Sequence, residues 1–516
     1  MLAPYLAEGL NAPFSHAGLM HRTKGNAFEL AEMGRAVGAA WINITRAAIQ
    51  SPFNPAPRAM LGSLSGMLDF AHHMYGAHMK HEFDFSVLDA ERTMELAQAA
   101  GVSRDQVHPR TINGAPTDFE IEIVDRKPFG NLKHFVVTDA HGEPHAPERP
   151  PLLIVAPMSG HFDTLLTGTV YRLMRDYDLY ITDWQDAKNI PVSAGTFDLD
   201  SYISYLKDDW LPLINERHQD GDTLQRKVHT LAVCQPGVPL MAATAMMDED
   251  NSPHTPLSVT MMGSPIDTRL SPTKVNKLAE ERGINWFLEQ AISQVAWGNA
   301  GAGRKVYPGK AQLLGFMMMN ADSHIDAHKE MALGMAFQEW NEKVEKGNFR
   351  HLTLGSIDTA RRREDFYKEY KTVCDLPAEF YLQTIDTVFQ RHLLPRGEMI
   401  YTDPHTSAQR IVNPSSISRV AIMTVEGGRD DITGRGQTSA IHDLTPNLPD
   451  DMRTHHEQTD VGHYGLFNGK QWRTQIAPRM IHFTSEADRK NGLVYAPRSE
   501  TLEAYRSAGI EPEMAP

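Results

Sequence analysis

Residues 228–239, VHTLAVCQPGVP, are the most informative segment of this chain for its fold. Residues 228–233 form a predicted strand that leads directly into Cys234 and a turn containing Pro and Gly. Residues 240–246 are small and apolar, and they predict a helix. A strand, a sharp turn and a helix in this order predict a nucleophile elbow, in which the turn lifts a reactive side chain out of the sheet.

Cys234 takes the position that serine holds in the usual G-x-S-x-G elbow. Ala232 and Pro236 stand where that motif has glycines. A buried cysteine at the end of a strand more often packs than reacts. From the local pattern alone, both a catalytic and a packing role therefore stay open.

Further strands are predicted on both sides of the elbow. Residues 152–156, LLIVA, are continuously apolar, as expected for a strand that helices cover on both faces. The other predicted strands are 119–123, 134–137, 179–182, 257–262 and 420–425. Helical stretches such as 169–175 and 202–214 lie between them. This alternation predicts an α/β fold with a mainly parallel sheet and right-handed crossovers.

The helix and strand pattern divides the 516 residues into five regions. We predict a helical N-terminal region (1–115), a first part of the α/β core (116–266), a helical insertion without a convincing strand (267–416), a second part of the core (417–485) and a C-terminal tail (486–516). An insertion near the carboxyl ends of strands suggests a lid over a site. A separate helical domain without a gating role is the alternative.

Composition excludes several classes of function. A formal net charge of -15 argues against a nucleic-acid partner, which requires a concentrated basic face. The chain has 2 cysteines, so a disulfide framework is not expected. The first twenty residues lack a basic leader and a continuous apolar stretch, and no run is long enough to span a membrane. We therefore expect a cytoplasmic protein.

The loop after 152–156 is a candidate for half of an oxyanion hole. It reads PMSGH, residues 157–161. In elbow enzymes of this type, one backbone N–H of the hole comes from this loop and the other from the residue after the nucleophile. Met158 or Ser159, together with Gln235, are the candidates. His161 is a candidate substrate contact, although a single loop histidine is more often simply solvated.

The predicted acid and base follow in the order nucleophile, acid, histidine. The strand 420–425 leads into EGGRDDI, which places Asp430 and Asp431 in a Gly-rich turn. Asp430 lies nearer the strand and is preferred, with Asp431 as the alternative. His463 stands between Gly462 and Gly465 in DVGHYG. In this scheme His463 accepts the thiol proton, and the aspartate orients its ring.

Several blocks together resemble the intracellular polyhydroxybutyrate (PHB) depolymerases. These blocks are 182–184 (TDW), 194–199 (AGTFDL), 234–239 (CQPGVP), 375–384 (DLPAEFYLQT), 426–437 (EGGRDDITGRGQ) and 462–469 (GHYGLFNG). The resemblance covers roughly residues 60–485, and Gly237 is a minor departure from it. It implies an α/β-hydrolase fold, a Cys234, Asp430 and His463 triad, and no cofactor or metal.

The resemblance also implies a substrate and a location. The substrate would be PHB or a related polyhydroxyalkanoate, as intracellular granules or oligomers, cleaved to 3-hydroxybutyrate monomers or oligomers. Trp286 is one candidate contact for an apolar polymer, and Phe316, which directly precedes a run of methionines at 317–319, is another. Packing of the insertion's own core is the alternative for each of them. Whether the protein forms a homo-oligomer stays open.

Two rival functions stay open. Polyhydroxyalkanoate synthases also use a cysteine elbow, but they are expected to have G-x-C-x-G, whereas this chain has Ala232 and Pro236. A non-catalytic granule-surface protein on a hydrolase scaffold is the second rival. A metal site at His72, His73, His78 and His81 ranks lower, because a polar helix face explains that spacing.

Overall fold

The computed structural model describes residues 119–137, 149–158, 166–220, 223–224, 226–309, 311–312, 373–493 and 508. The predicted N-terminal region, 1–115, lies outside these residues. Among the described residues, no helix combines the length and the apolar character needed to cross a membrane.

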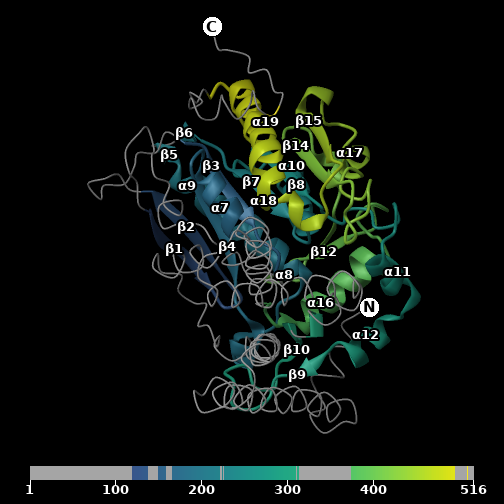
Figure 1. The fold of residues 1–516 in the computed structure, drawn as a ribbon. Helices are drawn as coiled ribbons and strands as arrows, with labels where there is room; N and C mark the ends of the chain where they lie inside the picture. The colour runs from purple at the N-terminus through teal and green to yellow at the C-terminus, as the bar shows by residue number, and fades with distance from the viewer. Residues whose placement is uncertain are drawn as a thin grey trace, which may run out of the picture.

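An eight-stranded sheet organises the described chain, in the order β1-β2-β4-β3-β7-β8-β14-β15 (Figure 1). Its strands are β1 (Phe119–Lys127), β2 (Gly130–Val137), β3 (Pro151–Val155), β4 (Asp178–Trp184), β7 (His229–Val233), β8 (Ser258–Met262), β14 (Ala421–Gly427) and β15 (Arg453–Gln458). Strand β2 runs antiparallel to both of its neighbours, and every pairing from β4 to β15 is parallel. This order, with its antiparallel second strand, is that of the α/β-hydrolase fold. The prediction of fold class is confirmed.

Helices cover both faces of the sheet. On one face, α8 (Leu199–Ser204), the π-helical turn η3 (Tyr205–Trp210) and α10 (Gly237–Glu249) pack on one another, and α9 (Leu211–Arg217) continues from η3. On the other face lie α7 (Thr167–Leu173) and α19 (Ala477–Lys490), the latter in contact with β8 and β14. The hydroxyls of Tyr177, after α7, and Thr484, on α19, lie 2.6 Å apart. The central strands are therefore covered on both faces.

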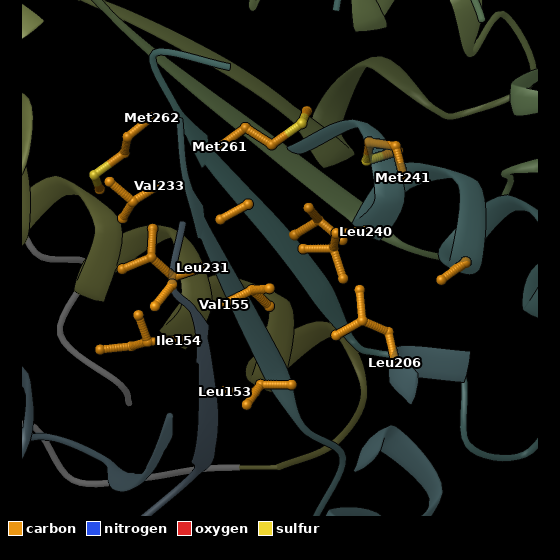
Figure 2. Close-up of a cluster of buried hydrophobic side chains, with 14 of the residues drawn as sticks. Leu153, Ile154, Val155, Leu206, Leu231, Val233, Leu240, Met241, Met261 and Met262 are labelled. Atoms are coloured by element: carbon orange, nitrogen blue, oxygen red, sulfur yellow. The ribbon is translucent and has the colours of Figure 1, made fainter. Parts of the chain in front are cut away.

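The core lies between the central strands and these helices. Every residue of β3, β7, β8 and β14 is buried. Figure 2 shows Leu231 and Val233 of β7 pointing to one face, while Leu240 of α10 lies near Val155 of β3 on the other. Burial on both faces explains why β3 reads as a continuous apolar run in the sequence, and why β7 and β8 contain no Asp, Glu, Lys or Arg.

The insertion, residues 267–416, contains strands that the sequence analysis did not predict. Its described helices are α11 (Lys274–Glu281), α12 (Ile284–Gln290), α16 (Ala378–Thr384) and the π-helical turn η4 (Ile385–Gln390). Its short strands are β9 (Ser293–Gln294), β10 (Lys305–Tyr307), β11 (Leu376–Pro377), β12 (Ile400–Thr402) and β13 (Gln409–Ile411). The expectation of a strand-free insertion was wrong, because strands of two or three residues carry too few side chains to show a period. Its role as a lid stays a prediction.

One further strand and one boundary differ from the prediction. Strand β15, Arg453–Gln458, was not predicted, and α19 runs to Lys490, across the boundary set at residue 485. The end of α19 belongs to the core, since Asp488 is buried and its carboxylate lies 3.1 Å from the Nε2 atom of His229 on β7. The remaining short elements are β5 (Gln219–Asp220), β6 (Thr223–Leu224), η1 (Ala187–Asn189), η2 (Val192–Ala194), η5 (Pro414–Ser416), α17 (Ile441–Leu444), η6 (Asp450–Met452), η7 (His463–Leu466), α18 (Gly469–Gln471) and η8 (Trp472–Ile476).

Candidate active site

Cys234 occupies the turn between β7 and α10 in a strained backbone conformation. Its φ is +66°, in the left-handed region that residues with a side chain rarely adopt. The Cys234 N–H donates to the carbonyl of Met262 over 2.8 Å, and the Cys234 carbonyl accepts from Gly237 N–H at 3.2 Å. The side chain is half-buried rather than sealed in the core. A strained, partly accessible thiol at the end of a central strand is the geometry of a nucleophile elbow.

Asp430 lies just beyond the end of β14 and is fully engaged. Its Oδ1 atom accepts hydrogen bonds from the backbone N–H groups of Ile432 (2.9 Å) and Thr433 (2.8 Å). Its Oδ2 atom lies 2.7 Å from Nδ1 of His463, and its side chain is 1% exposed. Asp431, the alternative acid, is exposed. The structure therefore brings Asp430, and not Asp431, to the predicted histidine.

His463 begins the short helix η7 and is buried between Asp430 and Cys234. The rings of Tyr464 and Phe467 each meet the imidazole edge-on, with centroids 5.9 Å away. Burial alone would lower the pKa of His463. The interactions of the ring with the Asp430 carboxylate and with Cys234 outweigh burial and raise the pKa of His463 well above the usual value. The raised pKa makes the imidazole a stronger acceptor for the proton of the Cys234 thiol.

The loops that carry the acid and the base pack backbone against backbone. Gly428 N–H donates to the Gln458 carbonyl at 2.9 Å, and Arg429 N–H donates to the Val461 carbonyl at 3.0 Å. A Cβ on Gly428 would lie 2.6 Å from the Cα of Thr459, which is closer than real contacts allow. Glycine at 428 therefore lets the Asp430 loop seat directly on the chain that leads to His463.

Gly263, which the sequence analysis did not single out, lies directly against the imidazole of His463. It follows β8 with φ +58°, and a Cβ there would lie 3.0 Å from Cε1 and 3.1 Å from Nδ1 of His463. The signal available in the sequence was a glycine directly after the predicted strand 257–262. Its meaning depends on β8 lying between β7 and β14, which the sequence does not reveal.

The predicted oxyanion-hole residues are only in part described. The backbone N–H of Met158, after β3, donates to the side-chain Oε1 atom of Gln235 at 3.3 Å. Gln235 itself follows Cys234 in the elbow and is half-buried. Ser159 and His161 lie outside the described residues. The two ends of the predicted hole, Met158 and Gln235, are thus in contact with each other.

Comparison with family models places the C-terminal part of the described core within a known family model. Residues 263–488 match the model described as PHB de-polymerase C-terminus, which is less than half of the chain. This part of the chain is similar to the PHB depolymerase family. The PHB depolymerase match includes Asp430 and His463. It begins at residue 263 and therefore does not include Cys234.

Solved structures of similar fold have low sequence identity to the chain. A naproxen esterase (carboxylesterase NP) from Bacillus subtilis is 13% identical, with a TM-score of 0.36, over 77% of this chain and 99% of that one. The carboxylesterase CesB (YbfK) from Bacillus subtilis is 11% identical, with a TM-score of 0.33, over 77% and 99%. A 2-hydroxy-6-oxo-6-phenylhexa-2,4-dienoate hydrolase from Rhodococcus sp. strain RHA1 is 9% identical, with a TM-score of 0.32, over 71% and 99%. Comparison with curated protein sequences gave no significant match.

Of the three predicted substrate contacts, Trp286 alone lies among the described residues. Trp286, on α12, packs edge-on against Phe287 with ring centroids 5.0 Å apart, and the Arg282 guanidinium lies 5.4 Å from the Trp286 ring. Trp286 belongs to a satellite apolar cluster around Phe287, whereas Cys234 packs against the main core. Phe316 lies outside the described residues. In the described part of the chain, no group of three or more His, Cys, Asp or Glu side chains is arranged to hold a metal ion.

Proposed function

We propose that the chain hydrolyses ester bonds of PHB or a related polyhydroxyalkanoate, with Cys234 as nucleophile, His463 as base and Asp430 as its orienting acid. The observation that carries the proposal is the linkage of three loops at the carboxyl edge of one sheet. Cys234 stands at a strained elbow, and the ring of His463 interacts with it and with Asp430. The match to the PHB depolymerase family supports hydrolysis of a carboxylic ester as the class of reaction.

The first chemical step would form a thioester. His463 takes the proton of the Cys234 thiol, and the sulfur attacks the ester carbonyl carbon while the carbonyl electron pair moves to oxygen. The N-terminus of α10, which begins at Gly237, favours negative charge at this position. Collapse of the intermediate breaks the carbon–oxygen ester bond, and His463 returns its proton to the departing alcohol.

The second step would hydrolyse the thioester. Water, activated by His463, attacks the acyl carbon, and the sulfur of Cys234 leaves. Asp430 does not exchange protons in either step. It keeps the ring oriented and stabilises the imidazolium, consistent with its 2.7 Å contact to Nδ1. The substrate would be the granule polyester or its oligomers, which would place the protein at granules.

The proposal is tested with the purified full chain and amorphous PHB. We expect release of 3-hydroxybutyrate or its oligomers, identified by mass, and a loss of roughly a thousandfold or more in Cys234→Ala. A synthase-like acyltransferase would instead polymerise hydroxyacyl-coenzyme A. A granule-surface protein would bind granules and release nothing. Hydrolysis at the parent rate by Cys234→Ala would remove Cys234 from the mechanism.

A further inference from the structure

The side chain of Gln235 accepts a hydrogen bond from one of the two N–H groups that are expected to form the oxyanion hole. Its Oε1 atom accepts the backbone N–H of Met158 at 3.3 Å. Met158 is 2% exposed, and its N–H makes no other hydrogen bond among the described residues. The backbone N–H of Gln235 itself makes none within the same part of the chain. These are the two N–H groups that would stabilise an oxyanion at Cys234.

The geometry points to a self-occupied oxyanion hole. We propose that the Gln235 amide is an internal occupant that fills the Met158 half of the hole in the free enzyme and is displaced by the substrate. This rests on the function proposed above. A glutamine amide oxygen is a neutral carbonyl acceptor, as an ester oxygen is, so it satisfies a buried N–H that would otherwise be desolvated. Gln235 acts here as a specificity-determining residue, because only ligands that displace its side chain can accept a hydrogen bond from the Met158 N–H.

The hydrogen bond is weak enough to be exchanged during turnover. At 3.3 Å it is longer than most N–H···O bonds, both partners are uncharged, and the Gln235 side chain is half-buried. An oxyanion is charged, and hydrogen bonds to charged groups are stronger than those between neutral groups. The amide therefore competes with the ester in the ground state but loses to the oxyanion that forms after attack.

Two substitutions distinguish a Gln235 side chain that occupies the hole from one that only holds the loop in place. Gln235→Met keeps the length of the side chain and removes the acceptor. Gln235→Glu keeps an acceptor and adds a negative charge, which holds the Met158 N–H more firmly and repels an oxyanion. If Gln235 is an occupant, a ligand binds most tightly to Gln235→Met, less tightly to the parent, and least tightly to Gln235→Glu. If Gln235 only holds the loop in place, the parent and Gln235→Glu bind the ligand equally well, and Gln235→Met binds it more weakly.

The measurement uses butanal, which adds reversibly to the Cys234 sulfur. The sulfur–carbon bond forms, the carbonyl electron pair moves to the oxygen, and the thiol proton ends on the hemithioacetal. Its oxygen lies in the hole, so binding measures the hole without turnover. Protection of Cys234 against alkylation by iodoacetamide gives the Kd. We expect the Kd to fall about two- to tenfold in Gln235→Met and to rise by a similar factor or more in Gln235→Glu.

Alkylation without butanal supplies the control. Displacement of iodide by the sulfur does not require the oxyanion hole, so each Kd can be corrected for any change in thiol reactivity. An equal Kd in the three proteins, a weaker Gln235→Met, or no protection in any of them would overturn the inference. Failure of the proposed function is a separate result. If the parent and the two variants bind butanal in the expected order, yet the parent releases nothing from PHB, the inference of an occupied oxyanion hole stands and the proposed depolymerase function is refuted.

Discussion

Replacing Asp430 by asparagine tests the acid–base pair most directly, because the surrounding hydrogen bonds fix the orientation of the new side chain. Oδ1 of Asp430 accepts two backbone N–H groups at 2.9 and 2.8 Å, and Oδ2 faces Nδ1 of His463 at 2.7 Å. In Asp430→Asn the amide oxygen keeps the two backbone bonds only if the NH₂ group faces His463. Flipping the amide would sacrifice both bonds, at a cost of about 1–3 kcal/mol. Most molecules would therefore present a donor to Nδ1.

A donor opposite Nδ1 places the histidine in the wrong tautomer. Nδ1 must then accept, so the ring proton moves to Nε2, where the proton of the Cys234 thiol would have to go. The substitution also removes the negative charge that raises the pKa of His463. By analogy with the same change in Ser-His-Asp enzymes, we expect kcat to fall by roughly 10³- to 10⁴-fold at neutral pH.

The assay is hydrolysis of p-nitrophenyl butyrate, with thermal unfolding measured in parallel to confirm that the variant folds. Asp431→Asn is the matched control, because Asp431 is the exposed neighbour in the same turn. We expect its kcat to stay within about twofold of the parent, as is usual for an exposed surface change. A folded Asp430→Asn that keeps kcat within tenfold, or an Asp431→Asn that loses more activity than Asp430→Asn, would refute the assignment.

Three further predictions follow from the same geometry. His463→Ala should lower kcat on p-nitrophenyl butyrate roughly a thousandfold; a variant that keeps a tenth of the parent rate would exclude His463 as the base. Gly263→Ala should lower kcat about tenfold or more with little change in KM, since the new methyl group meets the imidazole and the residue has φ +58°; an unchanged kcat would show that the ring has room to shift. Burial and the charge of Asp198 raise the pKa of Asp200 from 3.8 to about 7, so its ionisation lowers stability as the pH rises from about 4 through 7. Asp200→Asn should remove this slope and gain ~2 kcal/mol at pH 8.5 relative to pH 5 in urea unfolding, and parallel slopes in parent and variant would contradict it.

The central sheet could be predicted because its strands are covered on both sides. The five residues of β7 are all buried, and those of β3 and β8 are as well, and none of the three strands contains Asp, Glu, Lys or Arg. Chain order then paired Asp430 with His463, and the 2.7 Å contact between them agrees with that prediction. Their catalytic roles stay a prediction.

Strand β15 could not be predicted, because it lies at the edge of the sheet. Its sequence, RTHHEQ, has no apolar residue, and its side chains are exposed or only half-buried. Its place depends on the backbone ladder to β14 and on polar contacts such as that between the Thr424 hydroxyl and Nδ1 of His455, 2.9 Å apart. An edge strand of this kind has no hydrophobic period to detect. The contact between Met158 and Gln235 was equally hidden, since it joins residues from two different strand ends.

The sheet order explains why glycine is needed after β8. The nucleophile follows β7 and the acid follows β14, and β8 lies between them. Neighbouring strands are about 4.8 Å apart, so the acid strand is about 10 Å from the nucleophile strand. The imidazole of His463 must bridge that gap above the end of β8, whose backbone still bonds to both sides through the Met262 carbonyl and the Gly263 N–H. A side chain at 263 would stand in the path of the ring, whereas glycine leaves it open. The requirement for glycine is therefore set by the spacing of three strands rather than by the chemistry of the thiol.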